Sequence, residues 1–346
     1  MIHIGDCLEV MRGMDAGSVQ TCVTSPPYYG LRDYGVAGQI GLEDTPAEYV
    51  ARLVAVFREV RRLLRDDGTL WLNLGDSYAT DSKWGGSTGG KAAAALHGLG
   101  GGGRNKTATG LPDKNLIGIP WRVAFALQED GWFLRQDIIW AKPNPMPESV
   151  TDRCTKAHEY LFLLSKSPRY YFDQRAIREQ ATQSSMARWA QDIEGQAGSR
   201  RVPGKTNGAM KAVGGRSRRD SFARNGAVSN HMLPGQSAAQ HRRNRGADTF
   251  DTDGRNKRSV WNVATRPFRD AHFATFPEQL IEPCILAGAP AGGLVLDPFM
   301  GAGTTAVVAE RLGRQWLGCE LNPEYAEIAE ARIRVAQPGF AFGEIA

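Results

Sequence analysis

Residues 294–305, LVLDPFMGAGTT, decide the fold that we expect for this chain. The opening LVL is an apolar run of the kind that forms a buried strand, and Gly301 and Gly303 permit a tight turn. Thr304 or Thr305 then offers a hydroxyl that can cap a following helix. A strand, a glycine turn and a helix in this order are typical of one βα unit of a parallel sheet.

The same alternation continues through the rest of the chain. We expect strands at residues 2–4, 19–23, 69–74, 133–140, 160–164, 294–296 and 316–319, and helices at residues 48–64, 119–129, 277–287, 304–312 and from 323 onward. Asp67 and Gly68 are expected to end the first helix. The pattern predicts an α/β protein with a doubly wound, mostly parallel sheet. Ligands of such sheets bind beyond the carboxyl ends of the strands.

The overall composition is that of an ordinary globular enzyme, with 42% hydrophobic and 23% charged residues. No stretch of about 18 apolar residues predicts a membrane span, and Asp6 stands where a secretory signal would need basic and then apolar residues. The five cysteines are scattered and never spaced as CxxC, which argues against a disulfide framework or a metal site. We therefore expect a cytoplasmic protein without a membrane partner.

Two segments stand apart in composition. Residues 84–110 are rich in glycine and predict either a mobile loop or a segment that becomes ordered only with a ligand. Residues 174–258 hold 17 Lys and Arg against 7 Asp and Glu, although the net charge of the whole chain is only +5. Such a stretch suits a polyanionic partner, and a solvated disordered insert explains its composition equally well.

The glycine turn carries groups that suit a cofactor with an amino-acid tail. Asp297, at the end of its strand, can accept hydrogen bonds from a cationic amine, and the free N–H groups of the helix start favour a carboxylate. Glu320 ends the next strand, where a carboxylate can bind ribose hydroxyls. The third glycine of a dinucleotide fingerprint is missing. S-adenosylmethionine offers an ammonium, a carboxylate, a ribose and an adenine, which match this set.

The sequence VTSPPYY, residues 23–29, is the second informative motif. Prolines have no N–H, so a Ser-Pro-Pro turn presents carbonyl acceptors. An amino group held between the Ser25 hydroxyl and a proline carbonyl would have its lone pair free to attack a methyl group. Tyr28 could stack on a base that has swung out of its helix. A rigid turn with core tyrosines is the alternative that this motif leaves open.

Together, TSPPYY at residues 24–29 and DPFMGAGTT at residues 297–305 resemble the amino-methyltransferases of DNA, in the permuted group whose catalytic motif precedes the cofactor motif. Segments at residues 72–78, 140–147, 158–173 and 272–280 look like further sequence blocks of that family. The resemblance implies a circularly permuted, Rossmann-like methyltransferase fold that uses S-adenosylmethionine and double-stranded DNA. It also implies a target-recognition region where the basic residues gather, which makes the disordered-insert interpretation the weaker one.

The resemblance implies roles for individual residues as well. The residues expected at the target base are Ser25, Pro26, Pro27 and Tyr28. The residues expected around the cofactor are Asp297, Phe299, Gly301 and Gly303 in the cradle, Thr304 at the helix start, Glu320 at the ribose, Asp6 at the adenine and Phe276 beside them.

The implied organisation is a catalytic half at residues 1–173, a target-recognition region at residues 174–258 and a cofactor-binding half at residues 259–346. Ser at the first position of the catalytic motif favours transfer to the cytosine amino group (N4), because the family uses Asp there mainly for adenine (N6). Transfer to adenine, a catalytically silent DNA-binding protein, and methylation of RNA or of a glutamine amide are the alternatives. A cognate restriction endonuclease and a homodimer are further partner hypotheses.

Overall fold

The computed structural model describes residues 1–31, 34–79, 109–180, 254–265 and 275–336. The chain separates into two units, one of residues 1–177 with 258–346 and one of residues 178–257. In the second unit, the described ends pair with each other through a bridge between Glu179 and Arg255 and an ion pair of 2.9 Å. Most of the predicted basic region and of the glycine-rich segment therefore lies outside the described residues.

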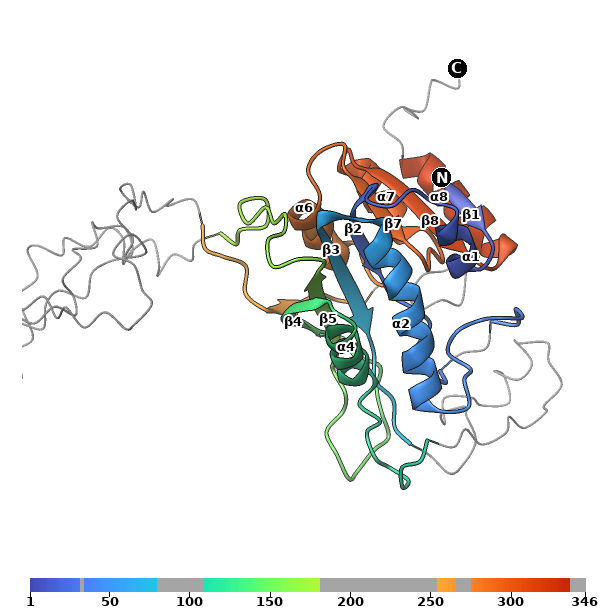
Figure 1. The fold of residues 1–346 in the computed structure, drawn as a ribbon. Helices are drawn as coiled ribbons and strands as arrows, with labels where there is room; N and C mark the ends of the chain where they lie inside the picture. Colours follow the sequence, from blue (N-terminus) through green and yellow to red (C-terminus); the bar gives the residue numbers. More distant parts are fainter. Residues whose placement is uncertain (32–33, 80–108, 181–253, 266–274, 337–346) are drawn as a thin grey trace, which may run out of the picture. The chain divides into compact units, whose positions relative to one another are not determined.

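In the described part of the first unit, eight strands form one sheet in the order β1-β8-β7-β2-β3-β5-β4-β6 (Figure 1). Their bounds are β1 (Ile2–Ile4), β2 (Val19–Thr24), β3 (Leu64–Leu74), β4 (Phe133–Ala141), β5 (His158–Ser165), β6 (Val260–Asn262), β7 (Leu294–Asp297) and β8 (Gln315–Glu320). Strand β5 runs antiparallel to β3 and β4, whereas the other neighbouring pairs are parallel. The prediction of a mostly parallel sheet is confirmed.

Helices cover both faces of this sheet (Figure 1). On one face lie α1 (Cys7–Arg12), α2 (Pro46–Leu63) and α4 (Ile119–Glu129), and on the other lie α6 (Glu278–Gly288), α7 (Thr304–Arg311) and α8 (Pro323–Ala336). Successive residues of a strand point to opposite faces. Leu70 and Leu72 accordingly pack in the core under α2, whereas Trp71 packs in the core under α6. Because alternate side chains of each strand point to opposite faces, both faces of the sheet present apolar residues that helices cover.

The end of α2 differs from the prediction. The helix begins with a capping box, in which Thr45 and Glu48 exchange hydrogen bonds, and it ends at Leu63. Leu64 already pairs with Val19 of β2, so the Asp67–Gly68 turn lies inside β3 instead of at the end of the helix. The register shifts between Val19 and Thr21, which accommodates the extra residues of β3. Sheet pairing therefore overrides the local turn signal.

Two smaller features complete the fold. Cys284 is fully buried in α6 and its thiol donates to the Leu280 carbonyl, so this cysteine is part of the helix packing. Within the described ranges, no helix combines the length and the hydropathy that crossing a bilayer requires.

Candidate functional site

The two motifs meet at one edge of the sheet. Strands β2 and β7 are parallel neighbours, with Thr21 opposite Val295 and Cys22 opposite Leu296. Both strands end at the same edge, so the turn after β2 and the turn after β7 start side by side. The Thr24 hydroxyl donates to Asp297 Oδ1 over 2.6 Å, across 273 positions of sequence. Two turns that are far apart in the sequence therefore lie together at this edge of the sheet.

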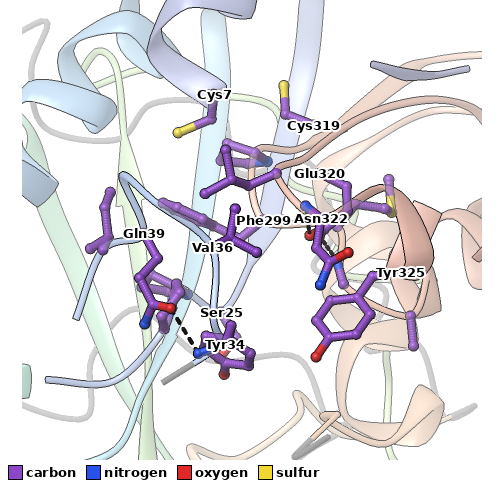
Figure 2. A pocket seen from close by; sticks show the side chains of 18 of the residues that line it. Cys7, Ser25, Tyr34, Val36, Gln39, Phe299, Cys319, Glu320, Asn322 and Tyr325 are labelled. Carbon is purple, nitrogen blue, oxygen red and sulfur yellow. Dashed lines mark hydrogen bonds between the residues drawn. The ribbon is translucent and has the colours of Figure 1, made fainter. Parts of the chain in front are cut away.

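A cavity lies between the two turns (Figure 2). Its lining includes four candidates for the target-base site and six for the cofactor site: Ser25, Pro26, Pro27, Tyr28, Asp6, Phe276, Phe299, Gly301, Thr304 and Glu320. The remaining two candidates, Asp297 and Gly303, are not among the lining residues. The cavity therefore brings together residues from both ends of the chain.

Asp297 is directed into the protein. Only 1% of the residue is exposed, and its carboxylate accepts hydrogen bonds from the hydroxyls of Thr24 and Thr305, each over 2.6 Å, and from the N–H of Phe299. Burial raises the pKa of Asp297 to about 6, although these hydrogen bonds favour the ionised form. In this arrangement the carboxyl group joins β2, β7 and α7. Its direct contact with a cofactor amine stays a prediction.

The start of α7 corrects the expected cap. The N-cap residue is Gly303, with φ of 77°, and no side chain caps the helix. A Cβ atom at Gly303 would lie 2.9 Å from Cβ of Ala329 in α8, so glycine is needed both for the left-handed backbone and for the packing of the two helices. Thr304 and Thr305 lie in the first turn instead. The Thr305 hydroxyl bonds Asp297, and Thr304 lines the cavity.

Two carboxylates at the cavity are held by backbone groups. Glu320 accepts the N–H of Gly301 at Oε2 over 2.8 Å and the N–H of Asn322 at Oε1 over 2.9 Å. Burial raises the pKa of Glu320 above its ordinary value. Asp6 caps α1, because its Oδ1 accepts the N–H groups of Leu8 and Glu9. Both carboxylates therefore have fixed positions at the ends of β8 and β1.

Sequence reasoning missed several residues on the cofactor side of the cavity. Asn322 and Tyr325 follow β8, and Tyr34 and Gln39 come from the loop after β2 (Figure 2). The Tyr34 N–H donates to the Gln39 side chain over 2.7 Å, and the rings of Tyr34 and Tyr325 meet edge to face at 6.3 Å. The position of Asn322 directly after a strand was a usable signal. The loop residues carried none.

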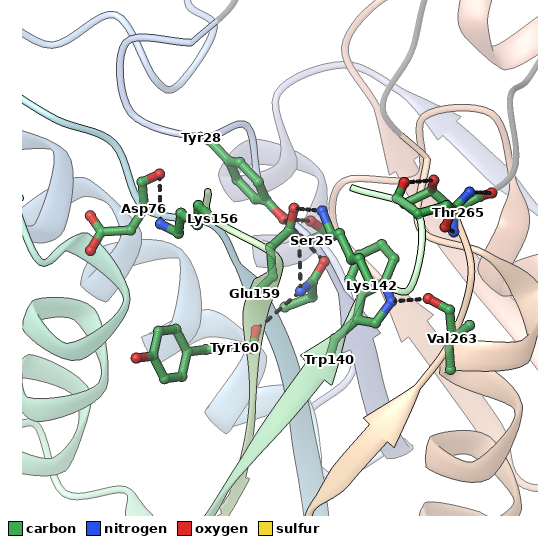
Figure 3. Close-up of polar contacts among 12 residues, drawn as sticks. Ser25, Tyr28, Asp76, Trp140, Lys142, Lys156, Glu159, Tyr160, Val263 and Thr265 are labelled. Atoms are coloured by element: carbon green, nitrogen blue, oxygen red, sulfur yellow. Dashed lines mark hydrogen bonds and ion pairs between the residues drawn. The ribbon is translucent and has the colours of Figure 1, made fainter. Parts of the chain in front are cut away.

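Sequence reasoning also missed a polar cluster behind the Ser-Pro-Pro-Tyr turn (Figure 3). The Tyr28 hydroxyl lies 2.7 Å from Glu159 Oε2 and 3.1 Å from Asn73 Oδ1, and the Ser25 hydroxyl approaches it at 3.5 Å. Lys142 forms an ion pair with Glu159. Burial, followed by the charge of Glu159, raises the pKa of Tyr28 well above its ordinary value, so its hydroxyl stays protonated.

Lys142 and Asn144, which follow β4, have different contacts. Lys142 belongs to the polar cluster, and its ammonium lies 4.3 Å from the centre of the Trp140 ring. Asn144 instead exchanges hydrogen bonds with the backbone of Thr265, donating to its carbonyl and accepting its N–H. Asn144 therefore holds two loops together.

Comparison with known proteins identifies related sequences. A family model for DNA methylases, N6_N4_Mtase, matches residues 19–331. The chain is 43% identical to the type II methyltransferase M.Cfr9I of Citrobacter freundii, over 95% of this chain and 86% of the relative. It is 42% identical to the type II methyltransferase M.SmaI of Serratia marcescens, over 96% of this chain and 90% of the relative.

Solved structures share the fold. The PvuII DNA methyltransferase, which is cytosine-N4-specific, superposes with a TM-score of 0.56 at 18% identity and covers 96% of this chain and 85% of its own. TTHA0409 of Thermus thermophilus, in complex with S-adenosyl-L-methionine, superposes with a TM-score of 0.54 at 22% identity and covers 98% and 95%. At these identities the likeness concerns the fold.

Proposed function

Since this chain belongs to the DNA methylase family that the N6_N4_Mtase model describes, we propose that it transfers a methyl group from S-adenosylmethionine to the amino group (N4) of a flipped-out cytosine in double-stranded DNA. One observation carries the proposal: the Ser-Pro-Pro-Tyr turn and the Phe299–Gly301 turn line the same cavity. A methyl donor held by one turn would face an amino group held by the other.

The chemistry of the cavity fits this cofactor. Among the described lining residues there is no Lys, Arg or His, whereas Asp6 and Glu320 carry carboxylates, so the site suits a cationic ligand. We assign Glu320 to the ribose hydroxyls and Asp6 to the adenine amino group. Phe299 and Phe276 supply apolar surface for the adenine. When bound, S-adenosylmethionine supplies a methyl group that is already activated by its positively charged sulfur.

The Ser-Pro-Pro-Tyr turn provides the groups for the amine. The Pro27 carbonyl already accepts a hydrogen bond from the Tyr49 hydroxyl, over 2.8 Å. We therefore assign the Pro26 carbonyl, together with the Ser25 hydroxyl, as the acceptors for the two amino protons. With both protons held in the plane of these acceptors, the nitrogen lone pair points out of that plane toward the methyl group. Tyr28 lines the same wall and offers its ring to the base.

The residues then act by alignment. The base nitrogen forms a bond to the methyl carbon as the carbon–sulfur bond breaks, and the nitrogen afterwards loses one proton to solvent. No covalent bond to the enzyme is needed. Holding the two reactants in line can contribute as much as about 7–11 kcal/mol to lowering the barrier. Ser25 and Pro26 supply that alignment on the side of the base.

The partners follow from charge and from the relatives. We propose that the basic segment at residues 174–258 contacts the DNA phosphates, because it holds 17 Lys and Arg against 7 Asp and Glu. Relatives over nearly the full chain are type II methyltransferases, so a restriction endonuclease of the same DNA site is the proposed cognate partner. The cytoplasm is the proposed compartment, and a homodimer is a further proposal that sedimentation would test.

The decisive experiment is base analysis of methylated DNA. Purified chain is incubated with unmodified DNA and methyl-labelled S-adenosylmethionine, and the digested nucleosides are separated and weighed by mass spectrometry. We expect label in N4-methylcytosine, and we expect it to accumulate at least about tenfold more slowly when Ser25→Ala is used as the matched control. Label in N6-methyladenine would replace cytosine by adenine as the target. Cofactor binding without transfer to any DNA would refute the enzymatic proposal in favour of a silent DNA-binding protein.

A further inference from the structure

The hydroxyl end of Tyr28 is held by residues from three strands or their ends. Asn73 lies near the end of β3, Glu159 lies in β5, and Lys142 directly follows β4. Strand β5 is antiparallel to both neighbours, so it enters the sheet at the edge where β3 and β4 end. Glu159 is thereby brought to the cavity edge at the start of its strand, directly behind the Ser-Pro-Pro-Tyr turn (Figure 3).

Two separate contacts fix the ring of Tyr28. Its hydroxyl donates to Glu159 over 2.7 Å, within reach of Asn73 at 3.1 Å. One edge of the ring lies against Gly75, where a Cβ atom would be only 2.4 Å from Cε2 of the tyrosine. The residue is nonetheless only partly buried and lines the cavity. The ring is therefore held at its hydroxyl and along one edge, while part of it remains open to the cavity.

The ion pair makes Glu159 a strong acceptor. The side chains of Glu159 and Lys142 are 16% and 18% exposed. Burying either charge without its partner would be unfavourable, so each charge stabilises the other. Lys142 also lies over the Trp140 ring, and Trp140 is fixed by a hydrogen bond of 2.8 Å to the Val263 carbonyl. The carboxylate is oriented further by the Asn73 amide, which donates to it over 3.3 Å and to the Tyr160 carbonyl over 3.0 Å.

We infer that Glu159 is a positioning residue, an inference that rests on the proposed function. Paired with Lys142, Glu159 holds the Tyr28 hydroxyl, so that the tyrosine ring presents a fixed surface to the target base. Glu159 acts through Tyr28 and has no contact with the cofactor side of the cavity, because it is not among the lining residues. Its removal should consequently slow turnover while leaving the affinity for S-adenosylmethionine unchanged.

The first test combines two variants of Glu159 with one control. Glu159→Ala should lower kcat by about tenfold or more with KM for S-adenosylmethionine within about twofold of the wild type, since small misplacements of a reacting group cost large factors in rate. Glu159→Gln keeps an oxygen acceptor for the hydroxyl, so its kcat should be at least about threefold higher than that of Glu159→Ala. Glu59→Ala, which breaks an ion pair with Arg62 on α2, should leave kcat within about twofold.

The double variant Tyr28→Phe/Glu159→Ala distinguishes positioning from general damage. The single variants Tyr28→Phe and Glu159→Ala are measured beside it. If Glu159 acts through the Tyr28 hydroxyl, kcat of the double variant should be within about twofold of the kcat of the slower single variant. Multiplying losses, or an unchanged kcat in Glu159→Ala, would overturn the inference.

The inference can also be tested without catalysis. Urea unfolding of the wild type, Tyr28→Phe, Glu159→Ala and the double variant gives a coupling between Tyr28 and Glu159 that does not require methylation of DNA. If the wild type methylates no base, the proposed function fails, and the cycle still decides whether Glu159 holds Tyr28: coupled losses support the anchor and additive losses refute it.

Discussion

Asp297 gives the protein a pH-dependent stability that one substitution should remove. The residue is 1% exposed, and burial raises its pKa from the ordinary 3.8 to about 6. Between these two values the folded state binds more protons than the unfolded state, so the free energy of unfolding falls as the pH rises. At 1.36 kcal/mol per pH unit, the carboxyl group should lose about 2 kcal/mol of its contribution between pH 4 and pH 7.

Asp297→Asn is a close mimic of the protonated carboxyl group. The amide oxygen can still accept from the Thr24 hydroxyl and the N–H of Phe299, which both bond Oδ1. The amide nitrogen would occupy the position of Oδ2 and donate to the Thr305 hydroxyl. The hydroxyl proton can then point to the Val23 carbonyl, which lies 3.3 Å away. No buried partner loses its hydrogen bond, so the substitution removes the ionisation and little else.

The assay is urea unfolding of the wild type and of Asp297→Asn at pH values from 4 to 7.5. All other titratable groups are shared, so the difference between the two unfolding free energies isolates Asp297. We expect the variant to gain about 2 kcal/mol relative to the wild type across this range. Thr305→Ser, which keeps the hydroxyl, should retain the pH dependence of the wild type. A difference that stays constant with pH would refute the assignment of a raised pKa to Asp297.

Four other expectations concern the site. Ser25→Ala should reduce kcat by about tenfold or more while calorimetry finds the affinity for S-adenosylmethionine unchanged, because the variant lacks one of two acceptors for the amine; an unaltered kcat would remove Ser25 from the mechanism. Gly75→Ala should cost about 1–3 kcal/mol of stability, measured by chemical unfolding, because the added methyl group would overlap the Tyr28 ring, and wild-type stability would contradict that contact. Glu320→Gln should weaken cofactor binding by about 1.5–3 kcal/mol in a calorimetric titration, since a charged acceptor for the ribose is lost; equal binding would exclude the contact. Deletion of residues 174–258 should abolish DNA binding and spare cofactor binding, and wild-type DNA affinity should fall with salt at a log–log slope of about −0.9 per neutralised phosphate, whereas a salt-independent affinity would speak against the basic segment as the DNA-binding surface.

Much of the fold could be read from local patterns. The apolar run at residues 294–296 and the helix period at residues 48–64 are properties of short segments, and the corresponding elements β7 and α2 are present in the structure. The rule that ligands bind beyond strand ends then selects Ser25 and Glu320 without knowledge of the packing. These signals are local because strand and helix periods depend on a few consecutive residues.

Features that depend on which segments become neighbours were not readable in this way. Thr305 looks like a capping residue in the sequence, yet its hydroxyl bonds Asp297 because β7 and α7 pack beside β2. Glu159 meets Tyr28 only because β5 runs antiparallel between β3 and β4. The amino-acid sequence by itself therefore determines which segments form strands and helices and which chemical groups stand at their ends. The direction in which each buried polar group points is decided by the donors that surround it after folding, since a buried group must find its partner wherever packing provides one.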